Sequence, residues 1–218
     1  MRVLSALLAR DLGLLLGSGR GGPWLPVLFF VAVAVLFPFA VGPDAPLLAR
    51  TGGGVLWIAA LLAAILPIDR LIAPDLEAGF FDQFALRGIS EELVLAVRLM
   101  AHWLTFGPLL LIAALPAAAL FNLPGDTARM LLLGLLAGTP GLAAIGIIIS
   151  SMTASLRGGA ALGGLLLIPL AVPILIFGAG ALANPDGEGL ALCAAISLAM
   201  CAVAPFASGA AVRAAREG

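Results

Sequence analysis

The chain has 218 residues, of which 62% are hydrophobic and only 11% are charged, and its mean hydropathy is +1.18. Soluble domains carry about 25% charged residues, so this composition excludes an ordinary water-soluble domain and predicts an all-α membrane protein. The net charge of −1 excludes a basic surface for nucleic acid, and the absence of lysine excludes a phosphate-binding P-loop, so we expect no ATPase activity in this chain.

Residues 1–22 are predicted to form an interfacial helix on the cytoplasmic surface of the membrane. Six leucines share one helical stripe, and Arg2 and Arg10 lie elsewhere around the helix. A secretory signal peptide is the alternative, but Arg10 and Asp11 interrupt the apolar run and no cleavage site of small residues follows. The glycine-rich segment 17–23 is expected to bend the chain into the bilayer. The leucines of the stripe are Leu4, Leu7, Leu8, Leu12, Leu15 and Leu16.

Six apolar segments are each long enough to cross a bilayer core, which takes roughly 20 helical residues. None has an Asp, Glu, Lys or Arg in its interior. When the segments alternate across the membrane, nine arginines fall on one side, and only Arg50 and Arg129 fall on the other. The positive-inside rule then predicts that both termini are cytoplasmic. The segments are 24–41, 52–68, 99–121, 130–152, 160–182 and 189–211.

The only long polar insertion, residues 69–98, is predicted to lie in the cytoplasm and to bind a partner. Within it, residues 80–87 make about two helical turns that place Phe80, Phe81 and Phe84 on one small face. Isolated helices of this length are marginal in water. This helix must therefore pack against a partner or against its own bundle, and both alternatives remain open. Its polar residues are Asp82, Gln83 and Arg87.

The third span is predicted to begin outside the membrane. Ser90 is a plausible N-cap, and Glu91 and Glu92 follow in the first turn, where the helix dipole favours anions. A helix over 91–121 would be roughly 46 Å long, which is longer than a bilayer core. It would tie the cytoplasmic insertion mechanically to the membrane, and two internal prolines, Pro108 and Pro116, could kink it.

Few residues in this chain can serve catalysis or metal binding. His102, Cys193 and Cys201 are the only members of their classes, so no structural zinc or iron–sulfur site can be assembled. The cysteines lie roughly 12 Å apart on one helix, too far for a disulfide, and are expected to be free thiols. For His102 we favour a helix-packing role over a haem or metal ligand. No carboxylate lies within a span, which disfavours an intramembrane enzyme and an ion-driven carrier.

The later spans contain small residues and prolines suited to close packing and bending. Gly134 and Gly138 form a pair of small residues one turn apart, which lets helix backbones approach in lipid. Such features fit a bundle that rearranges against a partner, and they fit a static bundle nearly as well. The remaining kink and packing candidates are Pro140, Pro169, Pro173 and Gly178.

Several short motifs follow one another along almost the whole chain. They are Arg10-Asp11, Phe29-Phe30, Phe37-Pro38, Gly54-Val55-Leu56-Trp57, Asp69-Arg70-Leu71 with Asp75, Gly79-Phe80-Phe81-Asp82, Gly138-Thr139-Pro140, and Pro169-Leu170 with Pro173-Ile174-Leu175-Ile176-Phe177-Gly178. This series resembles the cytochrome c maturation protein B family, the haem exporter permease subunits, and its last motif is the most specific.

The resemblance implies a transmembrane domain of the ABC-2 transporter type. Such a subunit has six spans, an N-terminal elbow helix and a cytoplasmic coupling helix between spans two and three, here as one domain over 1–218 in the bacterial inner membrane. The implied partners are a separate ATPase subunit (cytochrome c maturation protein A), the haem-handling protein C, the small protein D, a second copy of the chain and, indirectly, a periplasmic haem chaperone. ATP would bind to the ATPase subunit, haem would be cargo of the complex, and no cofactor is expected on this chain.

The resemblance also suggests how ATP hydrolysis would reach the membrane. Closure of two ATPase subunits would move the helix at 80–87, and the third span would pass that movement into a dimer of bundles. We expect the docking residues to be Phe80, Phe81, Asp82, Gln83, Phe84 and Arg87, above a base formed by Asp69, Arg70, Asp75 and Glu77. The alternative is a scaffold that anchors the ATPase and haem-handling subunits and passes neither force nor cargo.

Overall fold

The computed structural model describes residues 2–17, 22, 24–156, 159–183 and 187–217, in which helices are the only regular secondary structure. Six helices are long and apolar enough to cross a membrane, which confirms the predicted six-span all-α fold. The long helices are α2 (Trp24–Val41), α3 (Ala45–Ile65), α7 (Glu91–Leu120), α8 (Gly125–Thr153), α9 (Gly159–Gly180) and α10 (Glu188–Glu217). The shorter helices are α1 (Arg2–Gly17), α4 (Ile68–Leu71), α5 (Ala73–Glu77) and α6 (Phe80–Leu86).

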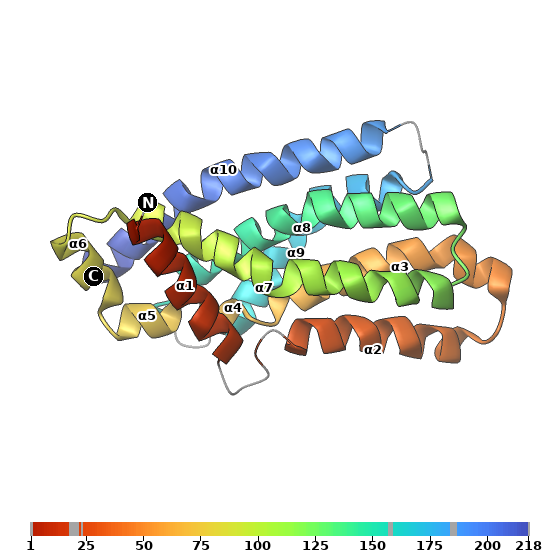
Figure 1. Cartoon of the computed structure of the whole chain (residues 1–218), viewed down its shortest axis with the longest axis horizontal. Coiled ribbons are helices and arrows are strands. Elements are labelled where there is room, and N and C mark those ends of the chain that lie inside the picture. Colours follow the sequence, from red (N-terminus) through yellow and green to blue (C-terminus); the bar gives the residue numbers. More distant parts are fainter. Residues whose placement is uncertain (1, 18–21, 23, 157–158, 184–186, 218) are drawn as a thin grey trace.

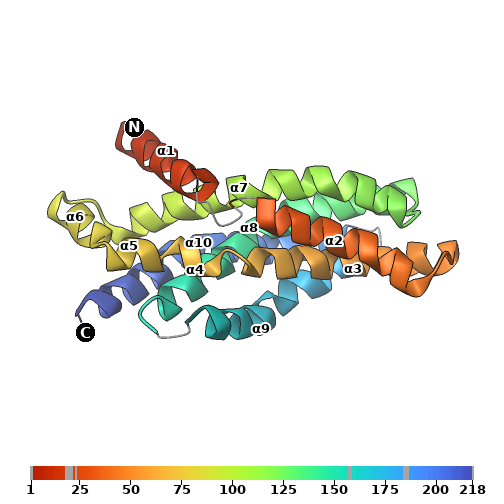
Figure 2. The same ribbon diagram turned by 90° about the horizontal axis from the view of Figure 1, so that it is seen from below.

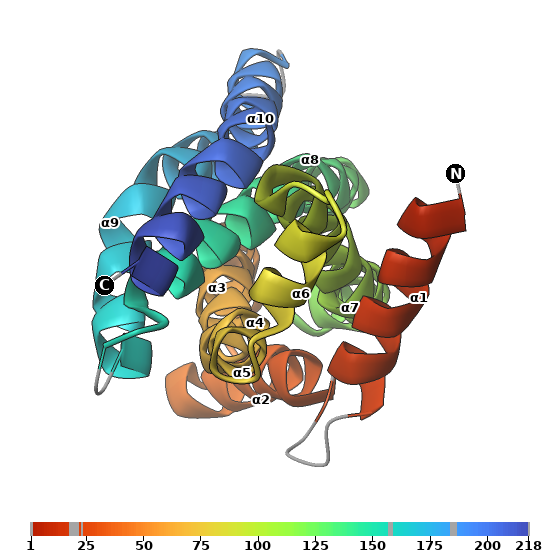
Figure 3. The same ribbon diagram turned by 90° about the vertical axis from the view of Figure 1, so that its left-hand side faces the viewer.

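The long helices run side by side, with α8 at the centre of the bundle (Figures 1 and 3). Helix α8 packs against α10, α9, α7 and α3, and α2 covers α3 and α7 from the margin. Both termini and α6 lie at one end, here called the α6 end (Figure 1). The α2–α3 and α7–α8 turns lie at the opposite end, here called the turn end. The topology therefore places the predicted coupling helix and both termini together.

Helix α1 crosses the bundle obliquely near the α6 end and packs against α7 (Figure 2). Its predicted leucine stripe is divided between two environments. Leu7, Leu8 and Leu15 pack into the hydrophobic cluster beneath α6, whereas Leu4 and Leu16 are exposed. The stripe is divided because the bundle itself covers one part of the helix. The predicted bend over 17–23 falls largely outside the described residues.

The second span begins earlier than expected, at Ala45 rather than at residue 52. The carboxylate of Asp44 caps the helix by accepting a hydrogen bond from the backbone N–H of Leu47 at 3.1 Å, and Pro46 lies in the first turn. Both features stabilise a helix start. Arg50, which the sequence analysis placed in a loop, therefore lies inside α3 and remains exposed. At α7 the expected start is confirmed, because Ser90 caps it through the N–H of Leu93.

The glycines of the later spans accommodate one aromatic ring. Trp57 of α3 is fully buried between α8 and α9. A Cβ at Gly134 would lie 3.0 Å from its Cζ2 atom, a Cβ at Gly138 would lie 2.7 Å from Cη2, and a Cβ at Gly178 would be closer still. The backbones of α8 and α9 also approach each other closely, as expected: the carbonyl oxygen of Gly178 lies 3.7 Å from the Cβ position of Gly134. Glycine is thus required here mainly because of Trp57.

The helices continue through the prolines that were singled out as kink candidates. Pro140 lies inside α8, and Pro169 and Pro173 lie inside α9. Both prolines of α9 are exposed on the outside of the bundle. The α8 backbone is supported just beyond Pro140, where the N–H of Gly141 donates to Ser197 Oγ of α10 at 2.7 Å.

Candidate functional site

Helix α6 lies at the end of the bundle, in the segment between the second and third spans (Figures 1 and 3). The predicted short helix over 80–87 is thus present as Phe80–Leu86. Glycines flank it on both sides, with φ of 67° at Gly79 and 70° at Gly88. This left-handed conformation strains other residues but not glycine. The two glycines therefore allow the sharp turns that set α6 across the bundle end.

The side chains of Phe81 and Phe84 face the protein, with exposed fractions of 2% and 8%. They were expected to contact a partner, but their burial removes them from the accessible surface of α6. The physical reason is that a short helix gains most of its stability from burying an apolar face. They pack in a cluster with Leu7 of α1, Leu95 and Val97 of α7, Ile147 of α8 and Val212 of α10.

The exposed surface of α6 and of its C-cap residue, here called the α6 outer face, consists of Asp82, Gln83, Ala85, Leu86 and Arg87. Leu86 is the large apolar residue among them, and 89% of its surface is accessible. Asp82, Gln83 and Arg87 were expected on the docking surface, whereas Leu86 was not. Its spacing of three residues from Gln83 was the signal that could have identified it, because such residues share a helix face. An exposed leucine beside polar neighbours is suited to contact with another protein.

A group of four charged residues, three buried and one half-buried, lies beneath α6 and is here called the inner charge cluster. Arg98 of α7 binds Asp11 of α1 through two hydrogen bonds, from Nε at 2.7 Å and from Nη2 at 3.0 Å. The same guanidinium also donates to Asp75 of α5 and to the backbone oxygen of Leu71. Arg10 completes the group with contacts of 2.8 Å to Asp11 and 2.7 Å to Asp75.

The inner charge cluster joins three helices by contacts that are shielded from solvent. Asp11, Arg98 and Asp75 are 1%, 3% and 8% exposed. Two cations face two carboxylates, so the group is neutral, which buried charges require. Of the four residues expected at the base of α6, Asp75 joins this cluster, Asp69 and Glu77 are exposed, and Arg70 is half-buried. The pairing of Asp11 with Arg98 was not predicted from the sequence. The position of Asp11, a charged residue within the leucine-rich segment 4–16, was the signal that could have indicated a buried partner.

Phe80 links α6 directly to α1. The guanidinium of Arg10 lies 3.8 Å from the centre of the Phe80 ring, within the range of a cation–π contact. The Phe80 ring in turn lies 5.6 Å from that of Phe84. Arg10 thus contacts both the inner charge cluster and the aromatic face of α6.

A second group, the outer charge cluster, ties α6 and α7 to the end of α10. Arg216 lies 2.6 Å from Asp82 of α6 and 2.7 Å from Glu91 of α7. Arg213 lies 2.5 Å from Glu92 and 3.3 Å from Glu91. Asp82, expected on the docking surface, therefore already has a partner in the chain. The α6 helix is connected to the last span as well as to the third.

The pKa of Asp75 lies below its ordinary value of 3.8. Burial by itself would raise the pKa of this carboxyl, but the hydrogen bond from Arg10 and the charge of Arg98 together outweigh the burial. A carboxyl with a depressed pKa in the folded protein stabilises the fold above its unfolded pKa. That contribution is lost as the pH falls through the folded pKa.

We therefore expect the protein to lose stability on acidification below about pH 4, and Asp75→Asn to reduce this loss. The amide cannot bind a proton in this range, so the variant should be less stable near neutral pH but should depend less on pH in acid. Unfolding of the purified protein in detergent, measured from pH 7 to pH 3, checks this. If the free energy of unfolding falls with pH in parallel for wild type and variant, Asp75 is not a source of the acid dependence.

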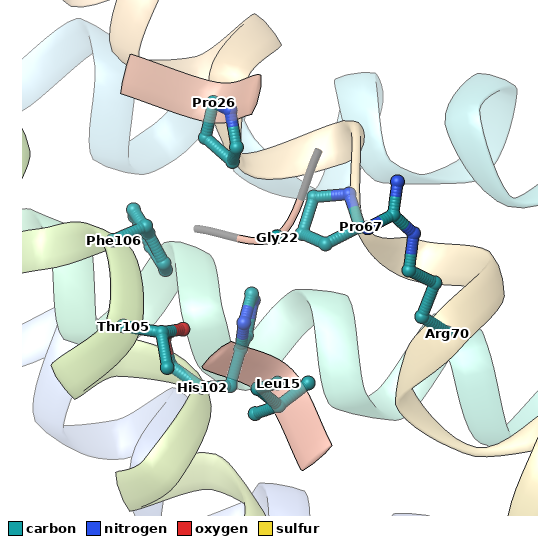
Figure 4. A pocket seen from close by; sticks show the side chains of 8 residues that line it. All are labelled: Leu15, Gly22, Pro26, Pro67, Arg70, His102, Thr105 and Phe106. Carbon is teal, nitrogen blue, oxygen red and sulfur yellow. The ribbon is translucent and has the colours of Figure 1, made fainter. Parts of the chain in front are cut away.

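His102 lines a small pocket between α1, the start of α2, α4 and α7 (Figure 4). Its side chain is buried, its ring centre lies 4.9 Å from that of Phe106, and Nε2 has no partner among the described residues. The pocket has a volume of about 20 Å³, enough for one water molecule. A porphyrin does not fit there, so the geometry favours the packing role over a haem ligand.

The chain is similar to known proteins over almost its whole length. The family model described as CcmB protein matches residues 2–215. Heme exporter protein B of Rhodobacter capsulatus is 43% identical over 216 residues, which cover 96% of this chain and 98% of the relative. The proteins of the same name from Paracoccus denitrificans and Escherichia coli are 42% identical over 215 residues and 35% identical over 193 residues. These cover 96% and 86% of this chain, and 98% and 88% of the relatives.

Proposed function

The chain belongs to the CcmB protein family, and from this premise we propose that it is the permease subunit of an ABC-type complex for haem export or delivery in the biogenesis of c-type cytochromes. It provides the membrane part of the complex, and a separate ATPase subunit binds and hydrolyses ATP. The observation that carries this proposal is the α6 outer face, which exposes Leu86 at the end of the bundle, while Phe81, Phe84 and Asp82 hold α6 to the rest of the chain.

Coupling requires that a movement of α6 reach the spans, and the contacts around α6 supply three connections. Phe81 and Phe84 belong to one hydrophobic cluster with residues of α7, α8 and α10. The inner charge cluster joins α1 and α5 to α7, and the outer charge cluster joins α6 to α7 and α10. Force applied to α6 therefore passes to the elbow helix and the last span as well as to the third span. The sequence alone predicted only the third span as the element that transmits the movement of α6.

The same arrangement supports one orientation of the chain in the membrane. We place the α6 end and both termini in the cytoplasm, where ATP is available, and the chain in the bacterial inner membrane. Of the eleven arginines, nine were predicted on the cytoplasmic side, and the seven of these that the structure describes lie towards the α6 end, which supports this placement. The ATPase subunit docks there, and the haem-handling protein C, the small protein D and a second copy of this chain complete the complex. A periplasmic haem chaperone receives the product at the turn end.

Replacing Leu86 by glutamate should weaken the association with the ATPase subunit by about tenfold or more, because a charge replaces the exposed apolar residue at the centre of the contact. Co-purification from membranes and assembly of c-type cytochromes are the measurements. Leu156→Glu is the matched control, since Leu156 is also exposed and follows α8 at the same end. Equal losses in both variants would contradict a specific role for α6.

Phe81→Ala and Phe84→Ala are less direct tests of docking. Both side chains are buried, so their removal would disturb the packing of α6 before it affected a partner. An ATPase assay on the purified complex, with and without this subunit, distinguishes the coupled permease from the scaffold alternative. A permease coupled to ATP hydrolysis should change the ATPase rate of the partner subunit, and Leu86→Glu should abolish that change. A rate that is independent of this subunit would favour a passive anchor.

A further inference from the structure

A groove at the turn end is not part of the coupling site. It has a volume of about 790 Å³ and lies between α3, the start of α8 and the end of α9. Most of its lining is apolar, including Val55 and Ile58 of α3 and Leu182 just after α9. Ile58, which lies in a helix long and apolar enough to cross a membrane, is 49% exposed. The groove is therefore an apolar surface at membrane depth that the described residues of this chain leave uncovered.

Gly54 is one of the residues that line the groove. A Cβ atom built at this position has no neighbour within 4 Å, in contrast to Gly134 and Gly138, which face Trp57. Gly54 is therefore not required for packing inside the protein. Arg50, Gly54 and Ile58 follow at intervals of four residues, so they form one line along α3. That line spans about 12 Å from the charged end to the apolar end.

Arg50 is the only charged residue that lines the groove. It is exposed and makes no hydrogen bond or ion pair with any residue that the structure describes. It lies more than one turn inside α3, towards the turn end of that helix, where an unpaired guanidinium beside the apolar part of the span is costly. A long arginine side chain can reduce this cost by reaching towards the interface and binding an anion there.

From these observations we propose that the groove binds one phospholipid with an anionic headgroup. An acyl chain lies on Gly54 and Ile58, and Arg50 binds the phosphate. Charge complementarity favours this occupant over a zwitterionic lipid, which carries its own cation. The length of the apolar line favours a lipid over a free anion, which would use Arg50 alone. The proposal is independent of the coupling function at the α6 end.

The test uses the purified full chain incubated with vesicles of equal parts phosphatidylglycerol and phosphatidylcholine, followed by native mass spectrometry of the retained lipid. Wild type should retain phosphatidylglycerol in preference to phosphatidylcholine. Arg50→Gln should reduce that preference by about tenfold, because a charge-assisted contact is lost. Gly54→Leu should reduce retention of both lipids by filling the groove. Arg129→Gln, a control at the same end but outside the groove, should behave as wild type.

Each other outcome would overturn the proposal. Unchanged retention in Arg50→Gln or in Gly54→Leu would show that the lipid is elsewhere. Displacement of the lipid preference by excess inorganic phosphate would identify a simple anion site. A dimer in wild type that Gly54→Leu dissociates would identify a second copy of the chain as the occupant. Size-exclusion profiles of the variants establish that each is folded.

Discussion

Replacing Arg98 by methionine should lower the free energy of unfolding by about 3–5 kcal/mol. The substitution removes the cation that binds both Asp11 and Asp75, and it leaves two buried carboxylates with only Arg10 between them. Methionine fills a similar volume, so the effect reports the unpaired charges more than a cavity. Unfolding of the purified protein in mixed detergent micelles measures the loss. Uncoupling of the ATPase should accompany it, because α1, α5 and α7 lose their common contact.

Two further variants make this prediction specific. Arg98→Lys keeps the charge but loses the two-pronged contact to Asp11, so an intermediate loss is expected. Arg213→Met removes an arginine of the outer charge cluster that is 42% exposed, and exposed ion pairs contribute little. Its stability should therefore remain close to that of wild type. Equal losses in Arg98→Met and Arg213→Met would contradict the buried character of the inner charge cluster.

Gly178→Ala should destabilise the bundle by about 1–3 kcal/mol, because the added methyl group collides with the Trp57 ring in a packed core. The ring cannot move away easily, since Gly134 and Gly138 of α8 contact it from the other side. Thermal unfolding of the purified protein measures the change. The expected sign is opposite to that of an ordinary glycine-to-alanine change in a helix, which stabilises.

Gly180→Ala is the matched control, because it lies in the same helix and its Cβ would meet nothing within 4 Å. It should be neutral or stabilising. Combining Gly178→Ala with Trp57→Phe should recover part of the loss, since a smaller ring leaves room for the methyl group, and the coupling should be about 0.5–3 kcal/mol. Additive effects of the two substitutions would mean that the collision with Trp57 is not the cause.

Features that depend on local sequence were predictable. Apolar runs of about 20 residues give six spans, and the Ser90 cap with its two glutamates fixes where α7 begins. The α6 helix could be placed to within a residue because glycines flank it and three phenylalanines share its face. The start of α3 was missed because the apolar run, rather than the Asp44 cap, was used to define it.

The candidate site was predicted less well, because its contacts join distant parts of the chain. Arg98 pairs with Asp11, 87 residues earlier, and Arg216 pairs with Asp82, 134 residues earlier. The spacing of charges along the sequence does not encode such pairs. The same limit applies to the aromatic face of α6, which periodicity identified without indicating whether it meets a partner or the chain itself.

The sequence by itself determined the lipid environment, the six spans and the short helix between the second and third, because hydropathy, capping and helical periodicity act within a few turns of the chain. Only the tertiary structure decided which side of that helix remains accessible, which charges are neutralised in its base, and why glycines surround Trp57. Those features depend on which helices become neighbours. That choice is made by packing over the whole bundle, where close contact rather than sequence distance determines the energy.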